Sequence, residues 1–222
     1  MAIIEFPPVD SADENGIVGL GGDLEVQSLI LAYTEGIFPW PIGPEIPLAW
    51  FSPEQRGVLY TDKFHISASL KKFLNKSPYT IKYNHNFAAV IKECAQVVRK
   101  GQKSTWITED IIQAYINMFQ HKLAYSVEAY DKDNELVGGV YGVCIGEIFS
   151  GESMFYKKDN ASKACLVALL TQLKQKKIKF LDTQMVTPVV KSLGGTEISR
   201  QLFIKTIKKS DTKKPREYFL GN

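Results

Sequence analysis

The chain lacks the sequence features that mark secreted and membrane-spanning proteins. It has only three cysteines, Cys94, Cys144 and Cys165, whose wide spacing is typical of reduced thiols in a cytoplasmic protein. No apolar run approaches the ~20 residues that a membrane-spanning helix needs. The first residues have neither a basic start nor an apolar stretch, so they do not resemble a secretory signal. These absences predict a soluble cytoplasmic protein without a membrane partner.

The familiar signatures of metal and nucleophile chemistry are also missing. His65, His85 and His121 have no companions at ligand spacing, so no metal site is predicted. The sequence has no G-x-S-x-G motif and no local cysteine–histidine signature of a covalent nucleophile. The glycine-rich run at residues 19–22 lacks the Gly-Lys-Ser/Thr ending of a phosphate loop and is interpreted as a turn.

Charge is present in quantity but is unevenly distributed. Residues 1–62 contain ten acids and one base, for a net charge of −9, whereas the other 26 bases and 14 acids give residues 63–222 a net charge of +12. This asymmetry favours a polyanionic partner for the second part, although lysines that merely keep a protein soluble are an alternative. The basic residues form three clusters, at residues 71–76, 174–179 and 205–216.

The first 62 residues differ from the rest in composition as well as charge. They are rich in glycine, proline and aromatic residues, which predicts loops and short strands, with one helix over 24–34 and Asp23 as its cap. Such a segment is too small for a strong core of its own. We therefore predict a small amino-terminal domain, 1–62, packed as an annex on a larger domain, 63–222.

Helices and strands alternate in the larger part. Ser67, Asn86 and Thr108 are candidate caps of three helices. Three strands in close order, over 124–130, 136–143 and 147–155, predict an antiparallel meander. A strong helix over 161–176, capped by Asn160, and a strand over 178–184 follow. The order of meander, helix and strand predicts an α+β fold with a mixed sheet.

Polar residues interrupt two of these strands. Period-two alternation places Asp182 and Gln184 on one face of their strand, about 6.5–7 Å apart. Gly151 precedes Glu152 inside another strand, where glycine often marks a bulge or the close approach of a ligand. If the two strands are neighbours, Glu152 and Asp182 share a cleft that suits a cationic amine. A strand that simply emerges into a loop, with an exposed carboxylate, is the alternative interpretation.

With these residues in view, the chain resembles the leucyl/phenylalanyl-tRNA–protein transferases over nearly its whole length. The resemblance is carried by ten segments in the family's order, which together are far more specific than any one alone. They lie at residues 16–24, 105–108, 136–139, 141–143 and 192–194, and at Gly36-Ile37-Phe38-Pro39-Trp40, Trp50-Phe51-Ser52-Pro53, Gly151-Glu152-Ser153-Met154-Phe155, Asn160-Ala161-Ser162-Lys163 and Asp182-Thr183-Gln184.

The resemblance implies an enzyme and its partners. Members of this family move leucine or phenylalanine from aminoacyl-tRNA to proteins with an amino-terminal Arg or Lys, which marks those proteins for degradation in the N-degron pathway. The family implies a small amino-terminal domain, then a domain similar to the acetyltransferase (GNAT) fold. It also implies that no metal or nucleotide cofactor is needed, because the ester on tRNA is already activated. We also expect a monomer.

The resemblance also assigns roles to residues of this sequence. The polar trio that acts in the reaction corresponds to Glu152, Asp182 and Gln184, with the division of roles among them open. Trp40 and Trp106 are candidates to stack on the terminal adenosine, as aromatic side chains do with unpaired bases. Four lysines are candidates to bind tRNA phosphates, namely Lys71, Lys72, Lys76 and Lys163. The aminoacyl side-chain pocket corresponds to Val140, Phe149, Met154, Leu166, Leu169 and Leu181, for which plain core packing is the alternative.

Some positions depart from the family's pattern. Val189 stands where relatives usually carry a histidine, and Val140 and Leu169 are smaller than the residues often found there. These departures leave open the acceptor preference and the selectivity between leucine and phenylalanine. Two other functions remain as alternatives: an acyl-CoA-dependent N-acetyltransferase, although residues 156–161 contain no glycine for a pyrophosphate loop, and a non-catalytic RNA-binding module.

Overall fold

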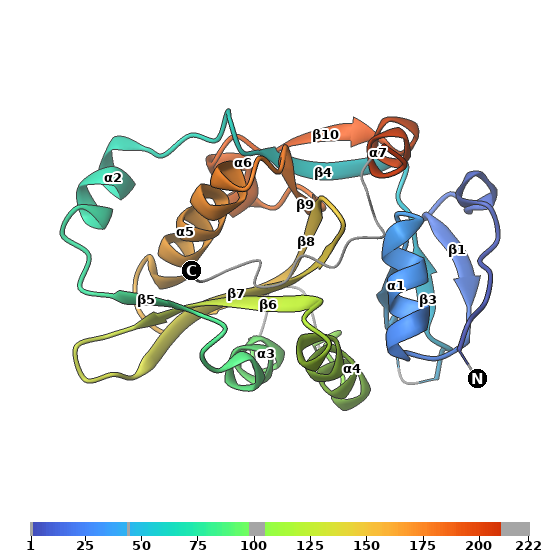
Figure 1. Cartoon of the computed structure of the whole chain (residues 1–222), viewed down its shortest axis with the longest axis horizontal. Coiled ribbons are helices and arrows are strands. Elements are labelled where there is room, and N and C mark those ends of the chain that lie inside the picture. The colour runs from blue at the N-terminus through green and yellow to red at the C-terminus, as the bar shows by residue number, and fades with distance from the viewer. Residues whose placement is uncertain (1, 44, 98–104, 210–222) are drawn as a thin grey trace.

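The computed structural model describes residues 2–43, 45–97 and 105–209, which form two sheets (Figure 1). The smaller sheet belongs to the amino-terminal part and has the strand order β1-β3-β2. Its elements are a 3-10 turn at Val9–Ser11, β1 (Ile17–Leu20), α1 (Val26–Thr34), β2 (Phe38–Trp40) and β3 (Ala49–Phe51). The prediction of one helix among loops and short strands is confirmed, because proline and glycine interrupt this segment too often for long elements.

The larger sheet has seven strands in the order β10-β4-β9-β8-β7-β6-β5. All neighbours pair antiparallel except β8 and β9, which are parallel. The strands are β4 (Gln55–Tyr60), β5 (Thr80–Tyr83), β6 (Ala124–Tyr130), β7 (Leu136–Ile145), β8 (Ile148–Tyr156), β9 (Phe180–Gln184) and β10 (Thr196–Ser199). The predicted antiparallel meander is β6-β7-β8, and the predicted α+β fold with a mixed sheet is confirmed.

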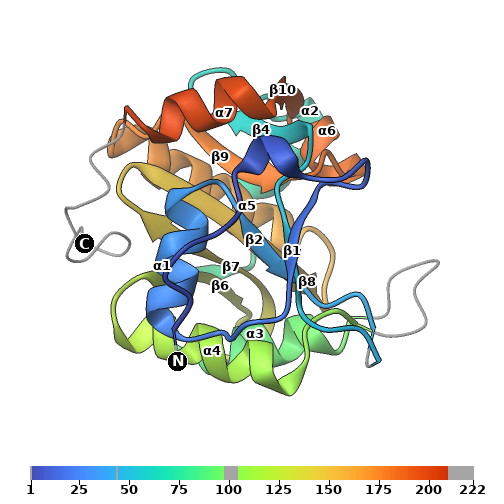
Figure 2. The same ribbon diagram turned by 90° about the vertical axis from the view of Figure 1, so that its right-hand side faces the viewer.

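Helices cover both faces of the large sheet (Figure 1). One face carries α5 (Ala161–Gln175), and the other carries α3 (Phe87–Ala95) and α4 (Glu109–Gln120). Viewed from the side, α1 and the small sheet lie in front of the large sheet (Figure 2). Leu29 and Trp50 of the amino-terminal part share one buried apolar cluster with Ile111 and Tyr141 of the larger part. The predicted annex therefore shares a core with the larger part.

Three shorter helices complete the described fold. They are α2 (Ala68–Leu74), α6 (Pro188–Ser192) and α7 (Arg200–Ile207). The predicted domain boundary after Asp62 leaves β4 in the first unit, yet β4 pairs with β9 and β10 of the large sheet. Both pairs are antiparallel, and β4 is the second strand from the β10 edge of the large sheet. The exact division of the chain into two domains stays a prediction.

Most predicted helix starts are found at the expected residues. The side chains of Ser67, Asn86 and Thr108 each accept a hydrogen bond from a backbone N–H in the first helical turn. Two predicted caps are wrong. Asp23 lies before the cap residue and bonds the backbone N–H of Glu25, and Asn160 adopts a left-handed conformation without a capping bond from its side chain.

Candidate active site

The parallel strands β8 and β9 separate soon after they meet. Their only paired residues are Phe149 with Leu181 and Ser150 with Asp182. Beyond these pairs the space between the strands opens into a cavity of about 860 Å³. Its walls come from the second half of β8, the end of β9 and the segment that leads into α6, and include residues 151–157, 183–185 and 187–190.

A bulge in β8 directs Glu152 into this cavity. Tyr141 of β7 pairs with Ser153, whereas Gly142 pairs with Gly151, so Glu152 is the extra residue that has no partner. Close packing requires glycine at position 142, since a Cβ there would lie 2.2 Å from the carbonyl oxygen of Ser150. The bulge that the glycine beside Glu152 suggested is confirmed. Glu152 lines the cavity and is 9% exposed.

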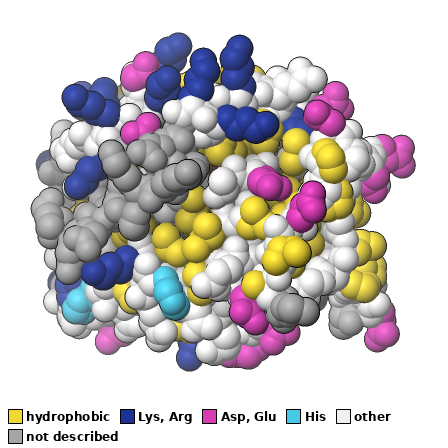
Figure 3. All heavy atoms as spheres, turned by 45° about the vertical axis from the view of Figure 1, so that its right-hand side comes forward, with side chains coloured by type: hydrophobic (Ala, Val, Ile, Leu, Met, Phe, Trp, Pro, Cys, Tyr) yellow, Lys and Arg dark blue, Asp and Glu magenta, His cyan; other side chains and the backbone are white. Residues whose placement is uncertain are grey.

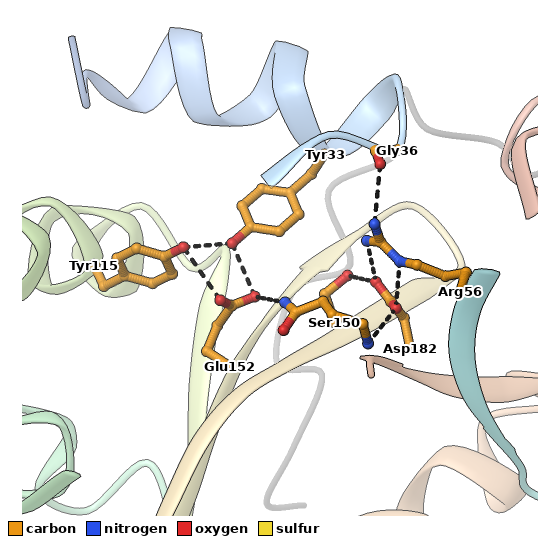
Figure 4. A network of polar contacts seen from close by, with 8 residues as sticks. Tyr33, Gly36, Arg56, Tyr115, Ser150, Glu152 and Asp182 are labelled. Carbon is orange, nitrogen blue, oxygen red and sulfur yellow. Dashed lines mark hydrogen bonds and ion pairs between the residues drawn. The ribbon is translucent and has the colours of Figure 1, made fainter. Parts of the chain in front are cut away.

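Hydroxyl and amide groups, rather than a cation, hold the Glu152 carboxylate (Figure 4). The Tyr33 hydroxyl of α1 and the Gln184 amide each donate to Oε1 at 2.9 Å, and the Tyr115 hydroxyl of α4 donates to Oε2 at 3.4 Å. The two tyrosine hydroxyls also lie within hydrogen-bonding distance of each other; because each has one proton, these three contacts share two hydroxyl protons. Burial raises the pKa of Glu152 to about 7, against the opposing effect of the Tyr33 hydrogen bond. This carboxyl therefore titrates near neutral pH.

Asp182 lies behind the cavity wall and is sealed from solvent. Its side chain is fully buried and does not line the cavity. Arg56 of β4 donates to both carboxylate oxygens, at 2.8 and 2.7 Å, and the Ser150 hydroxyl donates at 2.7 Å (Figure 4). The two strands are neighbours, as expected, but the expectation that Asp182 opens with Glu152 into one cleft is wrong. The reason is the arginine, which occupies the place expected for a substrate amine.

Arg56 is a residue of the candidate site that the sequence interpretation missed, as are Tyr33 and Tyr115. It is 1% exposed, it donates to the carbonyl oxygen of Gly36 at 3.2 Å, and its guanidinium lies between the rings of Phe38 and Phe203, 4.7 and 4.4 Å from their centres. It thereby joins the amino-terminal part, β9 and α7. One signal could have found it, since Arg56 is the only base among the first 62 residues.

Gln184 connects the two carboxylates, but not through strand alternation. Its φ of 57° is left-handed, and its backbone N–H donates to Asp182 Oδ1 at 3.0 Å while its side-chain amide donates to Glu152. Asp182 thus fixes the backbone that presents this amide to Glu152. Gln184 lines the cavity beside Thr183, whose buried hydroxyl has no hydrogen-bond partner among the described residues.

The residues expected around the aminoacyl side chain fall into two groups. Val140, Met154, Leu166 and Leu181 line the cavity, whereas Phe149 and Leu169 do not line it and are buried in the core cluster beneath α5. Trp40 and Trp106 both line the cavity and stack on each other, with ring centres 5.0 Å apart and planes at 18°. Val189 also lines the cavity.

The lysines expected to bind tRNA are not at the cavity. Lys71, Lys72 and Lys76 lie on and just after α2, at the far left of Figure 1, and Lys163 lies in the first turn of α5. None of the four lines the cavity, although Lys157 does. Within residues 2–43, 45–97 and 105–209, no three His, Cys, Asp or Glu side chains come together as a possible metal site.

Comparison with known proteins identifies the family of this chain. The sequence model of the leucyl/phenylalanyl-tRNA protein transferase family matches residues 58–208, and the model of that family's amino-terminal domain matches residues 22–54. The chain belongs to this family. A leucyl/phenylalanyl-tRNA–protein transferase from Flavobacterium johnsoniae is 45% identical over 91% of this chain and 95% of its own length. The transferase from Shewanella halifaxensis is 43% identical over 91% of this chain and 85% of its own length.

Two solved structures show a distant similarity to this chain. L-PGS from Bacillus licheniformis has 16% identity and a TM-score of 0.44, and the match covers 72% of this chain and 52% of that protein. An acetyltransferase of the GNAT family from Staphylococcus aureus has 16% identity and a TM-score of 0.34, and the match covers 46% of this chain and 71% of that protein. In the part of the chain that the structure describes, no helix is long and apolar enough to cross a membrane.

Proposed function

We propose that this protein transfers leucine or phenylalanine from aminoacyl-tRNA to the α-amino group of proteins that begin with Arg or Lys. The observation that supports the site is a buried, cation-free carboxylate, Glu152, in the wall of a largely apolar cavity that two stacked tryptophans also line. The apolar wall suits a leucine or phenylalanine side chain, and the carboxylate suits an amine. Membership of the family supports the donor and the reaction class.

The reaction is aminolysis of an ester. The nitrogen of the acceptor amine attacks the carbonyl carbon of the aminoacyl ester, a C–N bond forms, and the C–O bond to the ribose breaks. The amine loses one proton and the departing ribose hydroxyl gains one, so the step balances without an external oxidant or nucleotide. The enzyme must therefore supply a neutral amine, positioning, and stabilisation of the oxyanion that develops.

Glu152 and Gln184 are the two members of the polar trio placed to touch substrate. A carboxyl whose pKa is about 7 can attract the acceptor ammonium and accept its proton near neutral pH. Because the Gln184 Nε2 donates to Glu152, the amide oxygen is left to accept from the attacking amine. Asp182 takes part through Gln184, since it holds the backbone of that residue and is itself held by Arg56.

The apolar cavity is proposed to hold the aminoacyl side chain. Val140, Met154, Leu166 and Leu181 would contact it, with Phe149 and Leu169 supporting the wall from behind. Trp40 and Trp106 are proposed to bind the terminal adenosine, as aromatic rings do with unpaired bases. Trp40 is half-buried and Trp106 is 7% exposed. Because Trp40 and Trp106 already stack on each other, the base would lie against the outer face of this pair or between the separated rings.

The remaining assignments concern the partners and the setting. Lys71, Lys72, Lys76 and Lys163 are proposed to attract tRNA phosphates. A cytoplasmic location is proposed because aminoacyl-tRNA is made there. A monomeric state and the division into domains 1–62 and 63–222, which rests on the change in composition and charge, are also proposed. Analytical ultracentrifugation and limited proteolysis would test them.

The test is transfer of labelled leucine from leucyl-tRNA to a peptide beginning with Arg. The full chain at low salt should label this peptide and a Lys-initiated one, and leave an otherwise identical peptide beginning with Glu unlabelled. Phenylalanyl-tRNA should also serve as donor. Absence of transfer from both donors to every basic peptide would refute the proposed activity.

A further inference from the structure

A second hollow lies at the opposite end of the strands that form the cavity. It occupies about 310 Å³ between helix α7 and the first residues of β8 and β9, Ile148 and Phe180. The large cavity lies beyond the carboxyl-terminal half of the same strands. The two hollows have no lining residue in common. The second hollow is therefore a separate surface, named here the lysine groove.

Local structure brings four lysines to this groove. On α7 and the turn after it, Leu202, Lys205, Thr206 and Lys209 recur at helical spacing and share one face, while Phe203 and Ile207 are buried on the other. Lys177, with a φ of 60°, turns the chain out of α5, and Lys179 precedes β9. The groove thus collects the ends of two lysine clusters that lie far apart in the sequence.

Among the described residues, basic side chains outnumber acidic ones around the groove. Four lysines face it with a single acid, Glu147. None of the four lysines forms an ion pair in the part of the chain that the structure describes. Lysine and arginine side chains gather along the top of the molecule in Figure 3, the side on which Figure 1 places α7. Like charges around one concavity repel each other and concentrate a positive field, which an anionic ligand relieves.

We propose that the lysine groove binds backbone phosphates of the donor tRNA, away from its aminoacylated end. The proposal rests on the proposed function, because the donor is the extended polyanion that this function itself supplies. The floor of the groove, formed by Ile148 and Phe180, is buried and apolar, so it offers no side chain that reads bases. Binding here depends on charge, weakens with salt, and does not depend on tRNA sequence.

Two double variants with the same change in net charge test the proposal. Lys179→Glu with Lys205→Glu reverses two groove lysines, and Lys92→Glu with Lys132→Glu reverses two exposed lysines elsewhere; each lowers the net charge from +3 to −1. Filter binding of leucyl-tRNA is measured between 50 and 200 mM salt. The groove variant should flatten the plot of log K against log salt by about 2, and the control by less than half of that.

A minimal donor, leucyl-adenosine, separates the groove from the reaction site. The groove variant should raise KM for leucyl-tRNA about tenfold at low salt and leave transfer from leucyl-adenosine unchanged. Equal effects of the two variants would overturn the proposal, because they would reflect net charge alone. A raised KM for the acceptor protein, with tRNA binding unchanged, would also overturn it and assign the groove to an acidic protein segment. If the unaltered protein transfers from neither donor, the proposed function fails instead.

Discussion

Two buried carboxylates, 30 residues apart in the sequence, lie in the same sheet with opposite surroundings. Asp182 is sealed behind the wall and neutralised by Arg56 through two hydrogen bonds of 2.8 and 2.7 Å. Glu152 borders the cavity and is held by two tyrosine hydroxyls and an amide, without an adjacent cation. The first carboxylate is already satisfied as an anion. The second is left with a pKa near 7 and with access to substrate.

This difference assigns a positioning role to Asp182 and contact with substrate to Glu152. The two parallel hydrogen bonds from Arg56 fix the orientation of the Asp182 carboxylate. Asp182 in turn accepts a hydrogen bond from the Gln184 backbone N–H and so holds the turn that presents the Gln184 amide to Glu152. A carboxyl without a cation partner is the one that can respond to an incoming ammonium. Glu152, Asp182 and Gln184 are therefore not three equivalent groups. Substitutions and changes of pH should affect Asp182 and Glu152 differently.

The largest effect is expected on stability, from the sealed pair. Arg56→Met leaves the Asp182 charge buried without its partner and should lower the free energy of unfolding by about 3–5 kcal/mol. Urea unfolding measures it. Asp182→Asn should also destabilise, and the double variant should lose less than the sum of the two, since the pair is coupled. The control is Arg200→Met, in a part-buried arginine that donates to the Val9 carbonyl, with an expected loss of about 1 kcal/mol. Equal losses in the free energy of unfolding at Arg56 and Arg200 would mean that the Arg56–Asp182 pair is no more important to stability than an ordinary part-buried arginine.

The next effect is expected on transfer, from the carboxyl at the cavity. Glu152→Gln keeps the size of the side chain but cannot attract an ammonium or accept its proton, so kcat for leucine transfer should fall about 100-fold. Glu93→Gln is the matched control, because Glu93 also lines the cavity but is paired with Lys157 at its rim. Its kcat should change less than threefold. A similar loss at both glutamates would mean that the cavity needs negative charge in general rather than Glu152.

A smaller effect is expected from pH. Single-turnover transfer should rise with pH between 6 and 8 and level off above the Glu152 pKa of about 7, and Glu152→Gln should lose this inflection. Stability should follow the opposite direction. Between about pH 4.5 and 7 the folded chain keeps a proton on Glu152 that the unfolded chain releases. The contribution of Glu152 to the free energy of unfolding is therefore fully present below pH 4.5 and is lost as pH rises through 7. An inflection of the same size in Glu152→Gln would assign it to another group.

The smallest effect is expected from the tyrosines. Tyr33→Phe removes one hydroxyl bond to Glu152 and should cost about 1 kcal/mol of stability. Because that bond favours the ionised carboxyl, its loss should also move the inflection in transfer rate to higher pH. Tyr115→Phe, which removes the longer contact of 3.4 Å, should shift the inflection less. A shift to lower pH in either variant would contradict the proposed orientation of these hydroxyls.

Local patterns in the sequence predicted much of the fold and part of the site. Strand alternation located β6, β7 and β8, and the glycine beside Glu152 indicated the bulge that directs this side chain into the cavity. What the sequence does not show is long-range contact. Tyr33 and Tyr115 are 82 residues apart, and the pairing of Arg56 with Asp182 spans 126, so neither has a local signal. Lysine clusters were visible in the sequence, but not which of them surround a hollow.

One paired measurement tests whether the two carboxylates divide positioning and substrate contact between them. Glu152→Gln and Asp182→Asn are compared by urea unfolding and by single-turnover leucine transfer at a temperature where both are folded. Glu152→Gln should keep its stability within about 1 kcal/mol and lose transfer about 100-fold, while Asp182→Asn should lose about 3–5 kcal/mol of stability. A stable Asp182→Asn without transfer, beside an active Glu152→Gln, would contradict this division of roles.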